Sequence, residues 1–228
     1  MVSTFVAILD GPFLLLRFFS PAVQALDRAR GRAARRDNLL VKDWPAWATE
    51  RVDVQPYDPA WRQRGDQERQ LLEVSLAPWL VARVEHVGST AVPGLAAKPI
   101  LDLQAAVADL RCAPRIASSL APANWHYVAP DLDDRPWRRF FVKVIDGHRV
   151  AHLHLMTRDN SRWDEQLAFR DGLCADRKLV ESYAALKRTL AAQHAEDREA
   201  YTAAKTDFIL AVLKRGVAGD CTGHRSAP

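Results

Sequence analysis

The sequence predicts an α+β fold, in which a small mixed β-sheet is flanked by helices and followed by a helical C-terminal layer. Short apolar and β-branched runs, bounded by glycine and proline, occupy the middle of the chain. An amphipathic helical pattern precedes them, and the chain after Met156 is rich in Ala, Leu, Lys and Glu at helical spacing. Strands grouped between helices, rather than alternating with them, are typical of the α+β class.

The composition is that of a globular protein, because 48% of the 228 residues are hydrophobic and 26% are charged. A net charge of +4 permits phosphate-bearing ligands without requiring nucleic acid, so a nucleic-acid partner is not favoured. Cys112, Cys174 and Cys221 lie far apart, which excludes a cysteine-cluster zinc site and favours reduced thiols in a cytoplasmic protein.

Residues 1–50 are interpreted as an N-terminal extension. Its apolar run "FVAILDGPFLLLRFF" is too short to cross a bilayer, which takes about 20 residues, so no membrane span is predicted. The run is interrupted by Asp10, Gly11, Pro12 and Arg17. A docked helix, a disordered or dispensable extension, and a segment that docks on a protein partner all remain open. The Arg-rich "RARGRAARRD" that follows indicates a solvated linker rather than a nucleic-acid arm, because it contains no aromatic residues.

The folded domain is predicted to span residues 51–215. Asp58 and Pro59 provide the N-cap and first position of an amphipathic helix over Trp61–Leu80, which Pro78 should end or disturb. Two strands are expected next, Val81–Val87 and Pro99–Val107. The loop between these strands holds two glycines and two prolines.

The second half of the domain is predicted to contain one hairpin and several helices. A short helix should run from Asp109 to Leu120, and residues 138–146 and 149–156 should form a hairpin around Gly147 and His148. Helices are expected over Trp163–Cys174, Leu179–His194 and Asp197–Lys214, followed by a flexible tail at 216–228.

One carboxylate, Asp102, lies inside a run that reads as a buried strand. Side chains alternate along a strand, so Asp102 shares a face with Ile100 and Gln104, whereas Leu101 and Leu103 point the other way, into the core. Burying an ionised carboxylate is costly unless it is compensated. We therefore expect the Asp102 face to be the less buried one and to open on a cleft.

Two histidines follow the same alternation on the later strand. His152 and His154 share one face, while Leu153 and Leu155 take the other. If both strands lie in one sheet with these faces aligned, one carboxylate and two imidazoles converge, which is a credible divalent-metal site. The alternative is that both histidines hydrogen-bond neighbouring backbone or acidic groups.

Several residues are candidates for contacts with an anion. Gly88 and Ser89 follow a strand and could present N–H groups and a hydroxyl, although an ordinary tight turn is the alternative. Basic candidates are Lys98, at the end of the same loop, and Arg170, Lys187 and Lys205, on the late helices near Tyr183 and Tyr201. Solvated surface positions are the alternative for all four. Glu85 is expected to form a structural ion pair with a basic neighbour.

The segments "VQPYDPAW", "EHVGSTAVPGLAAKPILDL", "RFFVKV", "HLHL" and "LAFRDGL" together closely resemble the GrpB-like family of the nucleotidyltransferase superfamily. The resemblance covers about Val52 to Arg215. It implies a small mixed sheet with helices packed around it and a helical segment after it.

The resemblance also implies a chemistry. In the superfamily, a Gly-Ser turn precedes a pair of acids that, with a third acid on a later strand, hold Mg²⁺ on a nucleoside triphosphate. Carried over, Gly88 and Ser89 form the phosphate-side turn and Asp102 is the first metal ligand. Gln104 stands at the second acid position, and His152 or His154 falls at the third. This donor set would suit Mn²⁺ or Zn²⁺ as well as Mg²⁺.

Three functions follow as hypotheses. The first is transfer of a nucleoside monophosphate from a triphosphate to an unknown hydroxyl acceptor. Asp102 with His152 or His154 would hold the metal. Ser89, Lys98 and Lys187 would meet the phosphates, and Arg170 or Lys205 would meet the leaving pyrophosphate. The second is a non-catalytic module that binds a nucleotide or a protein partner, which is motivated by Gln104. The third is a metal-dependent hydrolase that uses the two-histidine strand.

Overall fold

A computed structural model describes residues 45–133, 135–195 and 197–220. Most of the predicted N-terminal extension and the last eight residues of the predicted tail, 221–228, therefore lie outside the described residues. Residues 45–50 belong to the folded body, because a 3₁₀ turn, η1 (Ala46–Thr49), lies against strand β5. At the other end, helix α8 continues to Asp220, so the predicted tail begins inside a helix.

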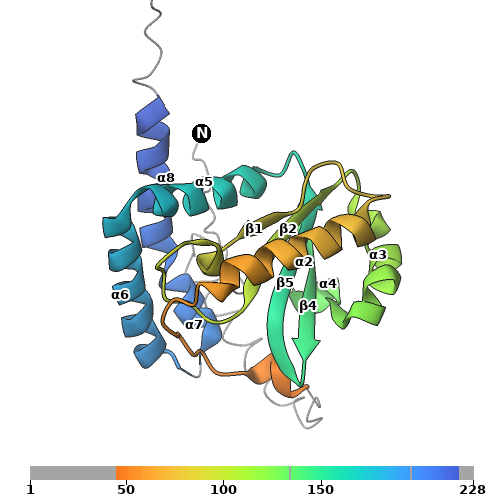
Figure 1. The fold of residues 1–228 in the computed structure, drawn as a ribbon, viewed down its shortest axis with the longest axis horizontal. Coiled ribbons are helices and arrows are strands. Elements are labelled where there is room, and N and C mark those ends of the chain that lie inside the picture. The colour runs from red at the N-terminus through yellow and green to blue at the C-terminus, as the bar shows by residue number, and fades with distance from the viewer. Residues whose placement is uncertain (1–44, 134, 196, 221–228) are drawn as a thin grey trace, which may run out of the picture.

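A five-stranded mixed sheet forms the centre of the molecule, in the order β1-β2-β5-β4-β3 (Figure 1). Strands β2 and β5 are parallel, and the other pairs are antiparallel. The predicted α+β class is thereby confirmed. The strands are β1 (Glu85–Val87), β2 (Leu101–Val107), β3 (Trp125–Val128), β4 (Arg138–Ile145) and β5 (His148–Thr157).

Two of the strand predictions need correction. The first strand was expected from Val81 but begins at Glu85, because residues 81–84 form an irregular approach held by the isolated bridge Leu80↔Val107. Strand β3 was not predicted, since its four residues mix polar and aromatic side chains at the edge of the sheet. The expected hairpin forms as β4 and β5 and turns at Asp146 and Gly147.

The helices follow the predicted order, except that the short helix Pro130–Asp133 was not predicted. The α-helices are α2 (Ala60–Leu76), α3 (Ala113–Leu120), α4 (Pro130–Asp133), α5 (Ser161–Ala175), α6 (Arg177–Gln193), α7 (Arg198–Ala203) and α8 (Thr206–Asp220). Asp58 Oδ1 accepts a hydrogen bond of 2.9 Å from the backbone N–H of Ala60, as the capping pattern predicted. The last predicted helix is divided into α7 and α8.

The two faces of the sheet are covered by different helices. Leu103 and Leu153 pack with α2 and α3 in the main core, and Figure 1 shows α2 crossing that face of the sheet. On the opposite face, Trp163 of α5 packs against Ala106 and Met156. Because side chains alternate, Asp102 and Gln104 lie on the α5 side, and helices decide how far they are exposed.

The loop between β1 and β2 is held by the C-terminal helices. Its Val92 and Leu95 are fully buried in a second apolar cluster with Phe169 of α5, Tyr183 of α6 and Ile209 of α8. The packing fixes the loop against the end of the sheet and brings α6 and α7 close to the start of β2.

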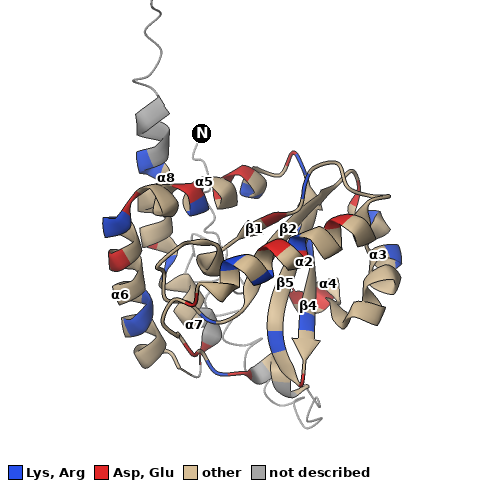
Figure 2. Ribbon diagram, viewed as in Figure 1, with Lys and Arg blue, Asp and Glu red and all other residues tan. Residues whose placement is uncertain are grey.

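Charged residues on the outer helices form local pairs. Figure 2 shows basic and acidic residues interspersed along α2, α5 and α6. Arg69 pairs with Glu73 on α2, and Arg177 pairs with Glu181 on α6, each at 3.0 Å. In the described part of the chain, no helix combines the length and apolarity needed to cross a membrane.

Candidate functional site

Asp102, His152 and His154 converge because two strands run parallel in the predicted alignment. In the register of β2 and β5, Asp102 lies beside His152 and Gln104 beside His154. The Nδ1 of His152 donates to Asp102 Oδ1 at 3.0 Å, and the Nε2 of His154 lies 3.8 Å from the same oxygen. One ligand atom from each residue lies within 4.8 Å of the others. The predicted convergence of a carboxylate with two imidazoles is therefore present.

The expected exposure of this face is wrong. Asp102 is only 4% exposed, His152 is 3% exposed, and every residue of β2 is buried. The helical layer covers the site, and this could not be read from strand alternation. The N–H of His152 compensates the buried carboxylate in part, as the alternative interpretation of the histidines required. The same carboxylate also lines a pocket.

Gly88 is required at its position for two independent reasons. Its φ of +69° and ψ of −171° lie in a region that is essentially restricted to glycine. A Cβ at this position would also lie 2.6 Å from Asp102 Oδ2 and 2.8 Å from Asp102 Cβ. The Asp102 side chain therefore occupies space that a side chain at residue 88 would need. Ser89 follows as the first residue of the 3₁₀ turn η2 (Ser89–Ala91).

Gly88→Ala should destabilise the protein more than Gly94→Ala. Both glycines have positive φ, but nothing lies within 4 Å of a Cβ at Gly94, so that variant incurs backbone strain alone. Overpacking against Asp102 should cost Gly88→Ala about 1–3 kcal/mol more. Urea unfolding of both variants measures the difference. Equal losses of stability would show that Asp102 does not pack against this turn.

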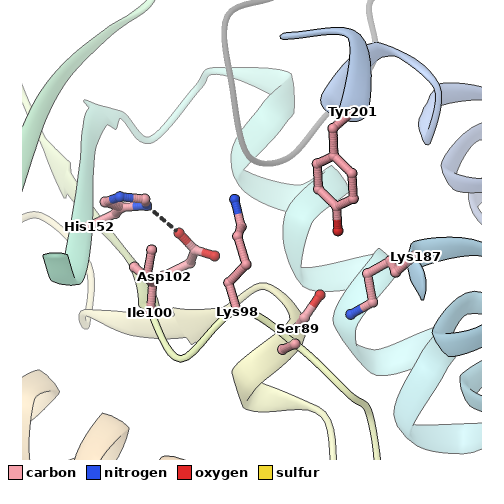
Figure 3. A pocket seen from close by; sticks show the side chains of 8 residues that line it. Ser89, Lys98, Ile100, Asp102, His152, Lys187 and Tyr201 are labelled. Carbon is pink, nitrogen blue, oxygen red and sulfur yellow. Dashed lines mark hydrogen bonds and ion pairs between the residues drawn. The ribbon is translucent and has the colours of Figure 1, made fainter. Parts of the chain in front are cut away.

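A small, narrow pocket opens beside Asp102. In Figure 3, Lys98 rises between Asp102 and Tyr201, while the Tyr201 hydroxyl and the Lys187 ammonium group point toward Ser89. The lining residues come from the turn after β1, the start of β2, strand β5 and helices α6 and α7; they are Ser89, Ala97, Lys98, Ile100, Asp102, His152, Lys187 and Tyr201.

Lysines surround Tyr201 on the helical side of the pocket. Lys205 Nζ lies 4.3 Å from the centre of the Tyr201 ring, and Lys98 Nζ lies 5.6 Å from it. Lys187 Nζ lies 4.8 Å from the centre of the Tyr183 ring. Each of the three ammonium groups therefore lies over the face of a tyrosine ring, which favours a positive charge. Lys187 and Lys205 are buried, which excludes the interpretation of these two lysines as solvated surface residues.

A family model described as GrpB protein matches residues 51–215. The chain belongs to the GrpB family. A UPF0157 protein of Pseudomonas aeruginosa is 36% identical over 179 residues, which cover 77% of this chain and 72% of that protein. The crystal structure of conserved protein GrpB from Enterococcus faecalis matches with a TM-score of 0.65 and 29% identity, over 74% of this chain and 99% of that one.

The match also extends to larger proteins. A dephospho-CoA kinase of Mycolicibacterium paratuberculosis is 28% identical over 189 residues, which cover 72% of this chain and 46% of the kinase. A region similar to this GrpB-family chain is thus one part of a longer protein there. The predicted membership of the GrpB family is confirmed.

Arg170 does not join the pocket of this GrpB-family chain. Its guanidinium pairs with Glu85 at 2.9 Å and with Asp171 at 2.8 Å, and it donates to the backbone carbonyl of His86 at 3.0 Å. It lines a separate pocket on the outer side of β1. The expected ion pair of Glu85 is therefore present, and its partner is one of the basic residues assigned to phosphate binding.

Gln104 is fully buried, and its side chain contacts α5. Its Nε2 donates to the carbonyl of Trp163 at 3.2 Å, in the first turn of that helix. A carboxylate could not make this contact, because both its oxygens are acceptors. Gln104, which the resemblance places at the second acid position, therefore contacts α5, and Asp102 is the acid of the cluster formed with the two histidines.

Sequence reasoning missed Arg138 and Asp133, which lie behind His154. Arg138 Nη1 contacts His154 Nδ1, and Asp133 holds the same guanidinium through Arg138 Nε at 2.9 Å and Nη2 at 2.6 Å. Burial raises the pKa of Asp133, but the hydrogen bonds and charge of Arg138 outweigh this and leave it below its ordinary value. Alternation on β4 places Arg138 on the same face as Phe140, whereas Asp133 carries no sequence signal.

His86 braces the glycine-serine turn from the opposite side. Its Nε2 donates to Thr90 Oγ1 at 3.0 Å, and Thr90 Oγ1 donates to the carbonyl of Ile100 at 3.2 Å, which joins the two ends of the β1–β2 loop. Gly65 leaves room for the ring, since a Cβ there would lie 2.2 Å from His86 Nδ1. Burial lowers the pKa of His86 to about 4, although the charge of Asp102 opposes this.

Stability should fall as the pH drops from 7 to 4. The unfolded chain protonates His86 near its ordinary value of 6.5, whereas the folded chain does so only near 4, so protons favour unfolding within this window. The difference corresponds to about 3 kcal/mol of unfolding free energy. Urea unfolding at several pH values measures the slope, and His86→Asn should reduce it. An unchanged slope in His86→Asn would contradict the low pKa.

Proposed function

We propose that this chain is a metal-dependent nucleotidyltransferase, which transfers a nucleoside monophosphate from a triphosphate to a hydroxyl acceptor. The observation that carries the proposal is a single pocket lined by Ser89, Asp102 and Lys187. Such a pocket combines a turn that can receive phosphate, an acid that can hold a cation, and a basic group that can meet the remaining phosphates.

The donor atoms present at Asp102 fit a divalent metal. One carboxylate oxygen of Asp102 and one ring nitrogen from each of His152 and His154 lie within 4.8 Å of one another, and the three residues are buried, so an ion there would be shielded from water. Oxygen and imidazole donors together suit Mn²⁺ or Zn²⁺ as well as Mg²⁺. When bound, the ion would supply positive charge that offsets the charge on the triphosphate.

The protein's own groups would position the nucleotide. The turn at Gly88 and Ser89 would supply backbone N–H groups, and the Ser89 hydroxyl points toward Tyr201 and Lys187. Lys98 approaches from the loop and Lys187 from α6. Lys205 contacts the face of Tyr201 and would add positive charge behind it. The transfer forms a bond from the acceptor oxygen to the α-phosphorus and breaks the bond to the pyrophosphate oxygen, and the hydroxyl proton of the acceptor is released to solvent.

Lys187→Met should weaken nucleoside triphosphate binding by about tenfold or more, because a buried lysine that meets phosphate contributes a charge-assisted contact. Lys178→Met is the matched control, since Lys178 is exposed on the same helix. Calorimetric titration of both variants with each of the four nucleoside triphosphates, in the presence of Mn²⁺, gives the comparison. The role assigned to Lys187 fails if the two variants bind alike.

A non-catalytic binding module is the second candidate, and the position of Gln104 favours it. Because Gln104 Nε2 is committed to Trp163, the site has no second acid at the position where the superfamily has one. Such a module would bind nucleotide without a divalent ion. Binding that is equally tight in chelator and in Mn²⁺, with no pyrophosphate released from any acceptor tested, would support this function over transfer.

A further inference from the structure

His154 lies between two polar groups, one at each ring nitrogen. Its Nδ1 contacts Arg138 Nη1, and its Nε2 lies 3.8 Å from Asp102 Oδ1. Turning the ring over would exchange both nitrogens for carbons and would lose both contacts. The two contacts therefore define the orientation of the ring.

The nature of Arg138 determines where the proton of His154 lies. A guanidinium remains protonated in proteins, carries only donors and cannot accept a hydrogen bond. Nδ1 of His154 must therefore accept with its lone pair. In the neutral ring the proton is then on Nε2, the nitrogen on the side of Asp102.

Arg138 is held firmly in this position. Asp133 accepts two hydrogen bonds from the Arg138 guanidinium, of 2.9 and 2.6 Å. The same guanidinium lies 4.2 Å from the centre of the Phe140 ring. Arg138 is 5% exposed and Asp133 is 7% exposed. Moving Arg138 away would separate a buried ion pair, which is strongly unfavourable.

We infer that Arg138 fixes His154 as the tautomer protonated at Nε2, so that His154 is a hydrogen-bond donor beside Asp102 and not a ligand of a metal ion bound there. A histidine that binds metal through Nε2 gives its Nδ1 proton to an acceptor. Arg138 cannot be that acceptor. His152 differs, because its Nδ1 faces the carboxylate of Asp102.

The inference changes the assignment of the site. A metal at Asp102 would be held by that carboxylate together with Nδ1 of His152, which would give up its proton when the metal binds. Nε2–H of His154 would donate to an oxygen bound beside them. Arg138 is then a positioning residue, because it acts through His154. The part that concerns metal rests on the proposed function, whereas the tautomer does not depend on it.

Nuclear magnetic resonance of the full chain with ¹⁵N-labelled histidine tests the tautomer directly. Long-range ¹⁵N–¹H correlations distinguish a protonated ring nitrogen from one with a lone pair, and His154→Gln assigns the signals. We expect His154 to carry its proton on Nε2 and His152 to carry its proton on Nδ1. A proton on Nδ1 of His154, or exchange of His154 between the two tautomers, would overturn the inference.

Variants at Arg138 separate positioning from a purely structural role. Arg138→Lys keeps a cationic donor and should keep His154 protonated at Nε2. Arg138→Gln can turn its carbonyl oxygen toward Nδ1 of His154, so His154 should be able to carry its proton on Nδ1 instead. Arg138→Gln should then bind Mn²⁺ more tightly than Arg138→Lys, because His154 can join the ligands. If Arg138→Gln does not fold, the wild-type and Arg138→Lys spectra still decide the tautomer.

Calorimetry with Mn²⁺ alone tests the ligand set. His154→Gln should keep the wild-type affinity, whereas a loss of about tenfold or more would identify His154 as a ligand and overturn that part of the inference. Absence of Mn²⁺ binding in the wild type would overturn the metal site of the proposed function. The tautomer spectrum would then still decide the role of Arg138, so the two failures are distinguishable.

Discussion

Asp133→Asn lowers the free energy of unfolding by about 3–5 kcal/mol, because it leaves the guanidinium of Arg138 buried opposite a neutral amide. Asp133 accepts two hydrogen bonds from Arg138 and one of 3.0 Å from Arg135, so one substitution weakens the whole network. Urea unfolding measures the loss. We expect this to be the largest stability effect of any conservative substitution near the site.

Asp109→Asn provides the matched control for this prediction. Asp109 also pairs with an arginine, Arg111, at 2.5 Å, but the pair is exposed and close in sequence. Surface pairs contribute little, because water solvates both partners and salt screens them. We therefore expect little change in stability for Asp109→Asn. A loss at Asp133 as small as the loss at Asp109 would show that the buried network does not hold β4 and α4 together.

Asp102→Asn abolishes the metal-dependent part of nucleoside triphosphate binding. The substitution keeps the size of the side chain but removes the charge of the carboxylate at the centre of the cluster with His152 and His154. A neutral amide is a much weaker partner for a divalent cation. Metal-independent contacts from Lys98 and Lys187 are retained, so residual binding should be the same with Mn²⁺ and with chelator.

The sequence predicted the face of each central strand correctly, because alternation is a local property. Asp102 and Gln104 follow period two on one strand, and His152 and His154 follow it on the other. One further condition was needed, namely that β2 and β5 pair in parallel register. The pairing is a long-range property, and it entered the sequence analysis as a condition rather than a derivation.

Burial of the Asp102 face could not be predicted in the same way. Its cover comes from helices far along the chain, and Lys187 of α6 and Tyr201 of α7 now line the pocket beside it. Amphipathic patterns show that such helices exist but not where they dock. The buried ion pair of Arg138 with Asp133 could not be predicted either. Arg138 lies in β4 and Asp133 in α4, and the sequence does not show how that helix packs against the strand.

Arg170 shows how local pairing can decide the role of a basic residue. Its place on a late helix put it among the candidates for phosphate binding, together with Lys187 and Lys205. In the structure, Glu85 and Asp171 lie within 3 Å of its guanidinium and hold it at the outer side of β1. Both acids are visible in the sequence. Only Asp171 is its neighbour there, and the other contact depends on how α5 packs on β1.

The most direct test of the account is a calorimetric titration of the wild type and of Asp102→Asn with the four nucleoside triphosphates. Each titration is run with Mg²⁺, with Mn²⁺ and with chelator. The account predicts that the wild type binds at least one nucleotide more tightly with metal than with chelator, and that Asp102→Asn loses this difference. Metal-dependent binding of equal strength in both proteins would contradict the central role given to Asp102, as would no nucleotide binding under any condition.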